Sequence, residues 1–383
     1  MHTASTLKIV LIGPSPKAQG GMASLMAAFL ASDLARQNSV RPVFTRQEGS
    51  AWVKLRMFFR GMAQFLWLSA VWRPHVCHIH FCSRVSFYRK SIFVIAAKLL
   101  GHKVVVQGHG GGFDPFYRSS NRLCKIFIRK MLAWPDRVLV GSQHSKEVLS
   151  RISGRSDVRV VNNFIADERI TGAGRCAELK SNLLFLGRIE KSKGIYELID
   201  AAAIVKEKAP GVRFVLAGAG EIDQAKERCL EKQVSDMVEF TGWIEGDEKL
   251  ALFQSAACFV LPSHRELQSI AVIEALAAGL PIVACDISGI REMVEDGVNG
   301  FLIRPGNARL LAGKIILLLG DSTLRRCMSR NNVLKFKSQF HSKLVVSDVN
   351  QVYQSVLNPA DTPHASQRRP SVRLIKLRAR GIL

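Results

Sequence analysis

Two glutamates eight positions apart give the strongest chemical signal in this chain. Glu266 and Glu274 lie in the segment SHRELQSIAVIEALAAGLPIVACDISG. An apolar run ends at Pro262, and the pattern after a short polar loop predicts a helix over 269–278 that Gly279 ends. Glu266 is therefore expected at the carboxyl end of a strand, where parallel α/β sheets bind ligands. Carboxylates beside an anion-attracting helix N-terminus suit a ligand with both hydroxyls and phosphate, such as a nucleotide sugar.

Two cations flank a turn earlier in the same half of the chain. Arg188 and Lys193 follow a strand expected from Asn182. A forked guanidinium and a compact ammonium could hold a diphosphate and stabilise a negative leaving group. Taken alone, such a pair is more often a solvated basic turn, and the two glutamates reverse that preference. The chain has no D-x-D sequence, so the two cations are expected to carry the charge, and no metal or cofactor is predicted.

Glycines and a histidine follow expected strands in the first half. Gly20 and Gly21 come after a strand at 7–13 and before a helix expected over 22–34. They could let a ligand approach the backbone closely, or they could simply form a tight turn. His109 follows the apolar run KVVVQG and precedes three glycines. It could bind substrate or exchange protons at a strand end, and a structural histidine is an equal alternative.

The run CHIHFC, from Cys77 to Cys82, resembles a metal cluster at first sight. Its spacing does not fit the usual zinc patterns. Neighbouring residues of a strand also point to opposite faces of the sheet. A strand with incidental Cys and His is therefore favoured over a metal site.

The elements that must position these residues alternate between strands and helices in both halves, which predicts two doubly wound parallel sheets of the α/β class. We expect an N-terminal domain over 1–170, a linker over 171–181 and a C-terminal domain over 182–340. A last helix over 341–358 could cross back to the N-terminal domain. The Pro/Arg-rich tail, 359–383, is expected to be flexible.

Charge is concentrated in the first half. The formal net charge is +23. Residues 1–180 carry 27 Lys/Arg against 9 Asp/Glu, whereas residues 181–358 are neutral. Such a basic half indicates an anionic partner: a membrane surface, nucleic acid or a phosphorylated substrate. Eight cysteines without a C-x-x-C pair fit a reducing, cytosolic compartment, and neither a signal peptide nor a spanning segment is recognised.

The segment 52–72 mixes Trp, Phe and Leu with Lys54, Arg56 and Arg60, and residues 51–100 contain no acid. This composition is typical of an interfacial helix on anionic lipid, with a core helix as the alternative. No aromatic–basic module supports nucleic-acid binding, so no nucleic-acid partner is predicted.

The motifs GRIEKSKG, FTGWI and the E-x(7)-E segment with EALAAGLPIVA resemble glycosyltransferase family 4, over nearly the whole chain. The resemblance implies the GT-B fold, in which two Rossmann-like domains face a central cleft. It also implies metal-independent, retaining transfer of a hexose from a nucleoside diphosphate sugar such as a UDP- or GDP-sugar. HGGGFDPFY and DRVLVGSQHSKEVL resemble bacterial members that build exopolysaccharide, O-antigen or similar surface glycans.

The resemblance also implies roles for single residues. Glu266 would bind the donor sugar beside its anomeric carbon, and His109 would lie near that sugar. Glu274 would bind the ribose. The remaining donor-binding positions implied are Arg188, Lys193, Gly20, Gly21, Leu267, Gln268 and Ser269.

One position departs from the family pattern. Leu267 stands where members commonly have glycine, and leucine does not easily adopt a positive φ. Donor geometry could therefore differ, and a non-catalytic, membrane-associated binding or scaffold protein of the same fold is the alternative. The expected acceptor is a glycan or a polyprenyl-pyrophosphate-linked sugar. The expected location is peripheral, on the cytoplasmic face of the inner membrane.

Overall fold

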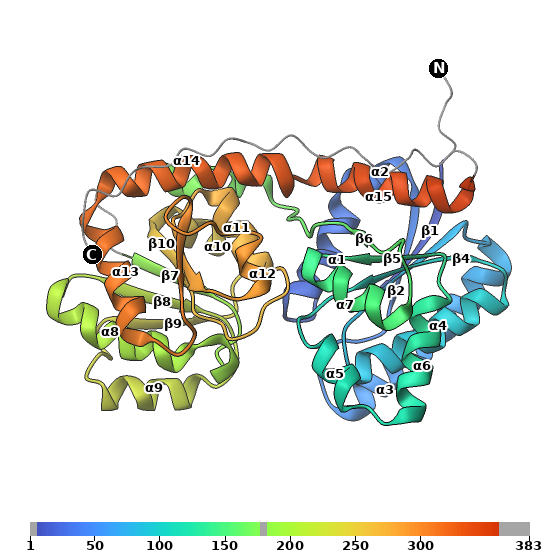
Figure 1. Ribbon diagram of the computed structural model, residues 1–383, viewed down its shortest axis with the longest axis horizontal. Helices are drawn as coiled ribbons and strands as arrows, with labels where there is room; N and C mark the ends of the chain where they lie inside the picture. The colour runs from blue at the N-terminus through green and yellow to red at the C-terminus, as the bar shows by residue number, and fades with distance from the viewer. Residues whose placement is uncertain (1–5, 177–181, 360–383) are drawn as a thin grey trace, which may run out of the picture. The chain divides into compact units, whose positions relative to one another are not determined.

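The computed structural model describes residues 6–176 and 182–359, which form two compact units (Figure 1). Unit 1 contains the chain up to Ala166 and the helix that follows His341, and unit 2 runs from Asp167 to Phe340. Each unit holds a six-stranded parallel sheet, so the predicted α/β class with two parallel sheets is confirmed. Residues 177–181 of the expected linker and 360–383 of the expected tail lie outside the described residues.

Unit 1 has the strand order β2-β1-β3-β4-β5-β6. Its strands are β1 (Lys8–Gly13), β2 (Ser39–Phe44), β3 (Val76–Phe81), β4 (Lys103–Gly108), β5 (Arg137–Val140) and β6 (Arg159–Val160). Its helices are α1 (Gly21–Ala31), α2 (Asp33–Gln37), α3 (Ala51–Trp67) with a π-helical turn at Leu68–Trp72, α4 (Val85–Leu99), α5 (Phe113–Ser119), α6 (Arg122–Ala133), α7 (Gln143–Ser153) and α15 (Ser342–Leu357). The inner strands are apolar along most of their length because helices cover both faces of the sheet.

The first helix of unit 1 is divided in a way that its apolar pattern did not predict. The helix expected over 22–34 ends at Ala31, and α2 begins at Asp33. Ser32 has an extended backbone, and its hydroxyl accepts a hydrogen bond from the Leu34 N–H. Serine therefore acts as an N-cap here, which starts a new helix instead of continuing the old one.

Helices α3, α4 and α6 form one layer on the sheet of unit 1. The rings of Phe58 and Phe93 lie 5.8 Å apart and join α3 to α4. Those of Tyr88 and Phe127 lie 5.9 Å apart and join α4 to α6. Figure 1 shows this layer on one side of the sheet and α2 with α15 on the other. One large apolar cluster of unit 1 lies between the sheet and the aromatic layer.

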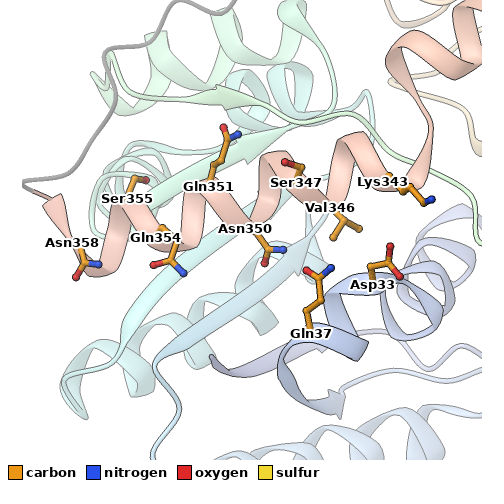
Figure 2. Close-up of a pocket in the computed structure, with 10 residues that line it drawn as sticks. All are labelled: Asp33, Gln37, Lys343, Val346, Ser347, Asn350, Gln351, Gln354, Ser355 and Asn358. Carbon is orange, nitrogen blue, oxygen red and sulfur yellow. The ribbon is translucent and has the colours of Figure 1, made fainter. Parts of the chain in front are cut away.

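Helix α15 packs on the opposite side of unit 1. The Tyr353 hydroxyl lies 2.7 Å from His78 Nδ1 of β3, deep in the core. A pocket of about 610 Å³ lies between α2 and α15, where amide side chains such as those of Gln37 and Asn350 line it (Figure 2). The last helix begins at Ser342, after a break at Phe340 and His341 that separates it from the preceding helix of unit 2.

Unit 2 has the strand order β12-β11-β10-β7-β8-β9. Its strands are β7 (Asn182–Leu186), β8 (Arg213–Ala217), β9 (Val238–Gly242), β10 (Ala256–Leu261), β11 (Ile282–Cys285) and β12 (Gly300–Ile303). Its helices are α8 (Ile195–Lys208), α9 (Ile222–Glu231), α10 (Gly246–Ser255), α11 (Ile270–Ala278), α12 (Ser288–Arg291), α13 (Ala308–Gly320) and α14 (Ser322–Gln339). Because β7 and β10 are neighbours, the loops that follow them, which carry Lys193 and Glu266, lie together at the carboxyl ends of the strands.

The described chain contains no membrane-spanning helix. Within residues 6–176 and 182–359, no helix combines the length and the apolar character needed to cross a bilayer.

Candidate functional site

Lys193 and Glu266 meet at the carboxyl ends of the neighbouring strands β7 and β10. Lys193 Nζ donates to Glu266 Oε1 at 2.6 Å, and 12% of the glutamate side chain is exposed. The residues are 73 positions apart in the chain. Partial burial shields the pair from solvent, so its electrostatic attraction is stronger than that of a surface pair.

A glycine lets the lysine loop lie directly on the glutamate loop. Lys193 ends a 3₁₀ turn (Lys191–Lys193), and Gly194 follows with φ +73°. A Cβ on Gly194 would lie 2.2 Å from the Pro262 carbonyl oxygen, so only glycine fits there. The His264 N–H donates to the Ser192 carbonyl at 3.0 Å, and His264 Nε2 lies 3.0 Å from Glu197 Oε1. These contacts hold the two loops in register.

The glycines after β8 support the same loop from the other side. A Cβ on Gly218 would lie 1.7 Å from the Gly187 carbonyl oxygen, and one on Gly220 would lie 2.3 Å from that of Ile189. In the structure they allow the backbone after β8 to pack against the backbone that carries Arg188.

Arg188 lies in the same loop but points into solvent. Its Nε donates to Glu190 at 3.3 Å, and 49% of its side chain is exposed. An exposed ion pair of this kind contributes little to stability. The guanidinium is therefore available to a ligand at small cost, whereas Lys193 must exchange Glu266 for it.

Glu274 is held by a residue that the sequence analysis did not single out. It lies in α11, is 5% exposed, and accepts a hydrogen bond from Lys249 Nζ of α10 at 2.7 Å. Burial raises the pKa of Glu274, and Lys249 acts in the opposite direction. Lys249 lies in a polar segment, GDEKLALFQS, where a lysine carries no distinctive signal. Only the packing of α10 beside α11 shows its role.

The loop between β10 and α11 contains the other predicted donor-binding positions. Ser269 is the N-cap of α11 and makes no side-chain capping hydrogen bond. Gln268 is buried, whereas Leu267 is partly exposed. Leu267 is not among the described residues with positive φ, so the loop differs here from the conformation that a glycine would permit. A Cβ on Gly289 would lie 2.2 Å from the Leu267 carbonyl oxygen, which shows how closely α12 covers this loop.

The predicted residues of the first half belong to unit 1. Gly20 has φ +122° and is the N-cap of α1, and Gly21 is the first residue of that helix. His109 follows β4, and its N–H donates to the Phe81 carbonyl at 2.7 Å. The glycines follow β1 and His109 follows β4, and both strands pair with β3.

His109 is one end of a buried row of polar rings. Its Nε2 lies 2.9 Å from His80 Nδ1, and the His80 and His78 ring centroids lie 4.4 Å apart. Tyr353 contacts the far end at His78. Burial lowers the pKa of His109 to about 4, and burial together with His109 lowers that of His78 to about 3. The row is therefore neutral near pH 7.

Cys77 to Phe81 of the run CHIHFC lie in β3, which agrees with the strand that the sequence favoured, and Cys82 follows the strand. His78 and His80 point to the same side, towards Phe29 and α15. Burial raises the pKa of Cys77 to about 12, which keeps that thiol protonated. No group of three or more His, Cys, Asp or Glu side chains within the described ranges is arranged to hold a metal ion.

Comparison with known proteins finds a family match in the second half of the chain. Residues 173–334 match the family described as Glycosyl transferases group 1. A glycogen synthase of Mycobacterium tuberculosis (strain ATCC 25618 / H37Rv) is 31% identical over 52% of this chain and 49% of its own length. A GDP-mannose:cellobiosyl-diphosphopolyprenol alpha-mannosyltransferase of Xanthomonas campestris is 23% identical over 81% of this chain and 83% of its own. The chain spans about half the length of several of the curated relatives that it matches.

Solved structures show the fold. Anabaena Alr3699/HepE, in complex with UDP and glucose, superposes with a TM-score of 0.72 at 17% identity, over 91% of this chain and 100% of that one. Together with the two six-stranded parallel sheets, this likeness confirms the GT-B fold class. The match to the Glycosyl transferases group 1 family therefore covers residues 173–334, which carry Arg188, Lys193, Glu266 and Glu274.

Proposed function

We propose that this protein is a retaining glycosyltransferase of family 4 that transfers a hexose from a nucleoside diphosphate sugar. The ion pair between Lys193 and Glu266 carries the proposal, because it places a diphosphate-binding cation beside a carboxylate that can accept hydrogen bonds from a sugar. The match of residues 173–334 to a glycosyltransferase family supports it. The names of the relatives favour a UDP- or GDP-sugar as donor.

Donor binding would work by exchange of partners. In the ligand-free chain Glu266 occupies the ammonium of Lys193. A donor diphosphate competes for that ammonium and recruits the exposed Arg188 as well. Glu266 is then released to accept hydrogen bonds from the donor sugar. The protein thus couples diphosphate binding to the presentation of the carboxylate. The Lys193 ammonium has an anionic partner in both states, and this offsets the cost of its partial desolvation.

Catalysis would rest on placed charge. As the bond from the sugar to the diphosphate breaks, negative charge grows on the leaving oxygen, where Lys193 and Arg188 stabilise it without further reorganisation. Glu266 faces the positive charge that grows on the sugar ring. The leaving phosphate itself would draw the proton from the acceptor, as the family resemblance implies. Glu274 would bind the ribose, and its partner Lys249 keeps its carboxylate oriented.

A bacterial surface glycan is the proposed product, and a polyprenyl-pyrophosphate-linked sugar is the proposed acceptor. The diphosphopolyprenol relative of Xanthomonas and a capsular polysaccharide glycosyltransferase of Staphylococcus aureus support this choice. Such an acceptor lies in a membrane, so the protein would work as a peripheral protein at the cytoplasmic face.

The layer of α3, α4 and α6 has the composition of a membrane-binding face. Trp52, Phe59 and Leu123 are 79%, 60% and 78% exposed. The three helices contain Lys and Arg but no Asp or Glu, so the face is cationic as well as apolar. Apolar side chains that insert at the interface, next to cations that attract anionic headgroups, match an anionic bilayer.

Sugar transfer is tested first with the whole protein. A thermal-shift screen of nucleotide sugars, without added metal, identifies the donor, because a bound donor raises the melting temperature. With that donor, Glu266→Ala is expected to lower turnover at least about 100-fold. The matched control is Glu207→Ala, which changes an exposed glutamate of α8. Full activity of Glu266→Ala would contradict the role of this carboxylate.

The same screen separates the catalytic proposal from the scaffold alternative that Leu267 raises. A nucleotide sugar that binds and is turned over supports the enzyme. Binding of no nucleoside diphosphate sugar, with the melting temperature of the folded protein intact, favours a non-catalytic binding protein. Leu267→Gly gives a second readout, because restoring the family's residue is expected to strengthen donor binding if the loop conformation limits it.

Membrane binding is tested by co-sedimentation with vesicles of phosphatidylcholine and phosphatidylglycerol. Trp52→Ser/Phe59→Ser is expected to weaken partitioning at least about 10-fold, because each serine buries less apolar area in the bilayer than the ring it replaces. Leu230→Ser is the matched control, because Leu230 is 69% exposed in unit 2. Equal partitioning of both variants would contradict the assigned face, and added salt should weaken binding of the unsubstituted protein.

A further inference from the structure

The carboxyl ends of β1, β2, β3 and β4 bring four loops of unit 1 together. Thr45, after β2, donates its N–H to the Gly13 carbonyl of β1 at 2.9 Å. Cys82, after β3, has its Sγ 3.8 Å from Met22 Sδ in α1. A Cβ on Gly110, after β4, would lie 3.8 Å from the same sulfur. Cys82 therefore lies against α1, which follows the β1 loop, and beside the loop after β4, and it marks the centre of this sheet edge, where parallel sheets bind ligands.

Three cations surround this centre. Lys90 of α4 is 2% exposed, and its Nζ donates to Thr45 Oγ1 at 2.5 Å. Burial raises the pKa of the Cys82 thiol to about 11, and Lys90, Arg46 and Arg89 each act to lower it. Burial also lowers the pKa of Arg89, and nearby Arg46 lowers it further. Arg89 is thus close to Arg46 and to its neighbour Lys90, and the like charges of each pair repel each other.

The cluster lacks the carboxylates that such cations normally have. In the part of the chain that the structure describes, Arg84, Arg89 and Lys90 form no ion pair with an Asp or Glu. Arg46 reaches only Glu48, at 3.8 Å on the surface. The Arg89 Nε is buried and has no hydrogen-bond partner. Lys90 is wholly buried, and burial lowers its pKa, which favours the neutral amine, while Arg89 is partly buried. An anion bound beside these side chains would hold Lys90 in its charged form and supply the missing partner of Arg89, so the arrangement is suited to receive one.

The backbone at the rim is strained in the same place. Arg84 is the N-cap of α4 and adopts φ +59° and ψ −133°, which a non-glycine residue rarely does. Its side chain is exposed beside Val85, whose side chain is 74% exposed. The first turn of α4 contains no acidic residue, so its free N–H groups add to the positive potential. A cation and an apolar side chain thus stand next to each other at the rim.

We infer that Arg46, Arg84, Arg89 and Lys90 form a binding site for the diphosphate of an isoprenoid-linked acceptor. Arginines would bind its phosphate oxygens through forked hydrogen bonds, and Lys90 would add a positive charge from beneath. The exposed apolar face of α3 and α4 continues from the rim and suits the hydrocarbon part of such an acceptor. The inference rests on the proposed transferase function and assigns its acceptor side to named residues.

The test uses the full chain with Arg188→Ala and Lys193→Ala, which removes the donor's cations in unit 2. Farnesyl diphosphate is titrated by calorimetry. Arg46→Gln/Arg89→Gln is expected to weaken its binding at least 10-fold. Arg36→Gln/Arg41→Gln, which changes two exposed arginines elsewhere in unit 1, is the matched control and should leave it unchanged. Melting temperatures confirm that each variant folds.

Two further measurements keep the inference falsifiable. Lys90→Met, which keeps the buried chain but removes the charge, is expected to weaken farnesyl diphosphate binding without lowering the melting temperature. Unchanged affinity in the Arg46/Arg89 variant, or an equal loss in the control, would overturn the site. The site would also be overturned if the Arg46/Arg89 variant bound phosphatidylglycerol vesicles more weakly but farnesyl diphosphate equally well, because the anion would then be a lipid headgroup. Nucleotide-sugar binding by the chain with intact Arg188 and Lys193 reports on the proposed function separately.

Discussion

The two units of this protein treat buried charge in opposite ways. In unit 2, Lys193 is paired with Glu266 and Lys249 with Glu274, each at hydrogen-bond distance. In unit 1, Arg89 and Lys90 lie partly or wholly buried without a carboxylate among the described side chains. The difference distinguishes a site that is complete before its ligand arrives from one that a ligand completes.

The same contrast extends to solvent. Unit 2 keeps its charges balanced, and under the proposed function an incoming diphosphate would exchange places with a carboxylate. Unit 1 exposes apolar side chains on α3, α4 and α6 and carries an excess of cations. A balanced unit suits a small soluble donor, and a cationic, apolar unit suits an acceptor held at a membrane.

The largest expected effect comes from breaking a pair in unit 2. Lys249→Met leaves Glu274 buried without a counter-charge and is expected to lower the free energy of unfolding of unit 2 by about 3–5 kcal/mol. Hydrogen exchange in α11 measures this, because exchange reports on one unit at a time. Lys206→Met is the matched control, since its pair with Asp236 lies at the surface.

The loss should also depend on pH in a defined direction. Without Lys249 the pKa of Glu274, already raised by burial, rises further. A carboxyl whose folded pKa lies above its unfolded pKa stabilises the fold more as pH falls. The variant is therefore expected to recover stability in mild acid. A loss that stays the same from pH 8 to pH 5 would show that Lys249 contributes packing alone.

Unit 1 is expected to lose stability in acid. Burial lowers the pKa of His109 from 6.5 to about 4, so the unfolded chain binds more protons between these values. Stability is complete above pH 6.5 and falls as pH drops towards 4, by about 3 kcal/mol for this residue. His78 and His80 lie in the same row and also have lowered pKa values, chiefly through burial.

Hydrogen exchange in β3 and β4 as a function of pH checks this prediction. His109→Asn is expected to make the curve shallower, because one proton fewer is taken up on unfolding. A flat curve between pH 6.5 and pH 4 would show that the buried histidines already carry charge in the folded state.

The smallest expected effect comes from two glycines with the same backbone conformation. Gly194 in unit 2 and Gly154 in unit 1 both have φ +73°. Gly154→Ala meets no atom within 4 Å and should cost about 1 kcal/mol from backbone strain alone. Gly194→Ala clashes with the Pro262 carbonyl, which should add about 1–3 kcal/mol.

The glycine pair also has a functional readout. Gly194→Ala pushes the lysine loop away from the glutamate loop, so donor binding is expected to weaken, whereas Gly154→Ala leaves it unchanged. Urea unfolding measures the stability difference, and the donor identified by thermal shift measures binding. If both substitutions lowered the free energy of unfolding equally, the lysine loop would be free to move away from the glutamate loop, and the Lys193–Glu266 pair would not hold the two loops together.

Local patterns predicted much of the second unit. The helix at 269–278, its end at Gly279 and the place of Glu266 before it agree with α11 and the loop that precedes it. The predicted break between helix and strand relies on glycine and proline, whose backbone preferences act within a few residues. The single helix predicted over 22–34 in unit 1 was wrong, because its apolar pattern continues through Ser32, and that serine caps a new helix.

Contacts between distant segments were beyond reach of those patterns. Lys249 could be assigned to Glu274 only once α10 was seen beside α11, and Leu267 could be placed only once the backbone of its loop was known. Glu266 and Lys193 were chosen by residue type and by resemblance, whereas their hydrogen bond follows from β7 and β10 being neighbours in the sheet.

The amino-acid order by itself determined the alternation of strands and helices, the basic first half and the acidic and cationic residues of the second, since these depend on composition and short-range periodicity. The tertiary structure alone decided that Arg46, after β2, meets Arg89 and Lys90 of α4 around Cys82. Strand order governs such meetings, because the loops at one sheet edge come from segments far apart in the chain. Because Lys90 is buried among them, it stays charged only beside a counter-charge, whereas a surface lysine is stabilised by solvent.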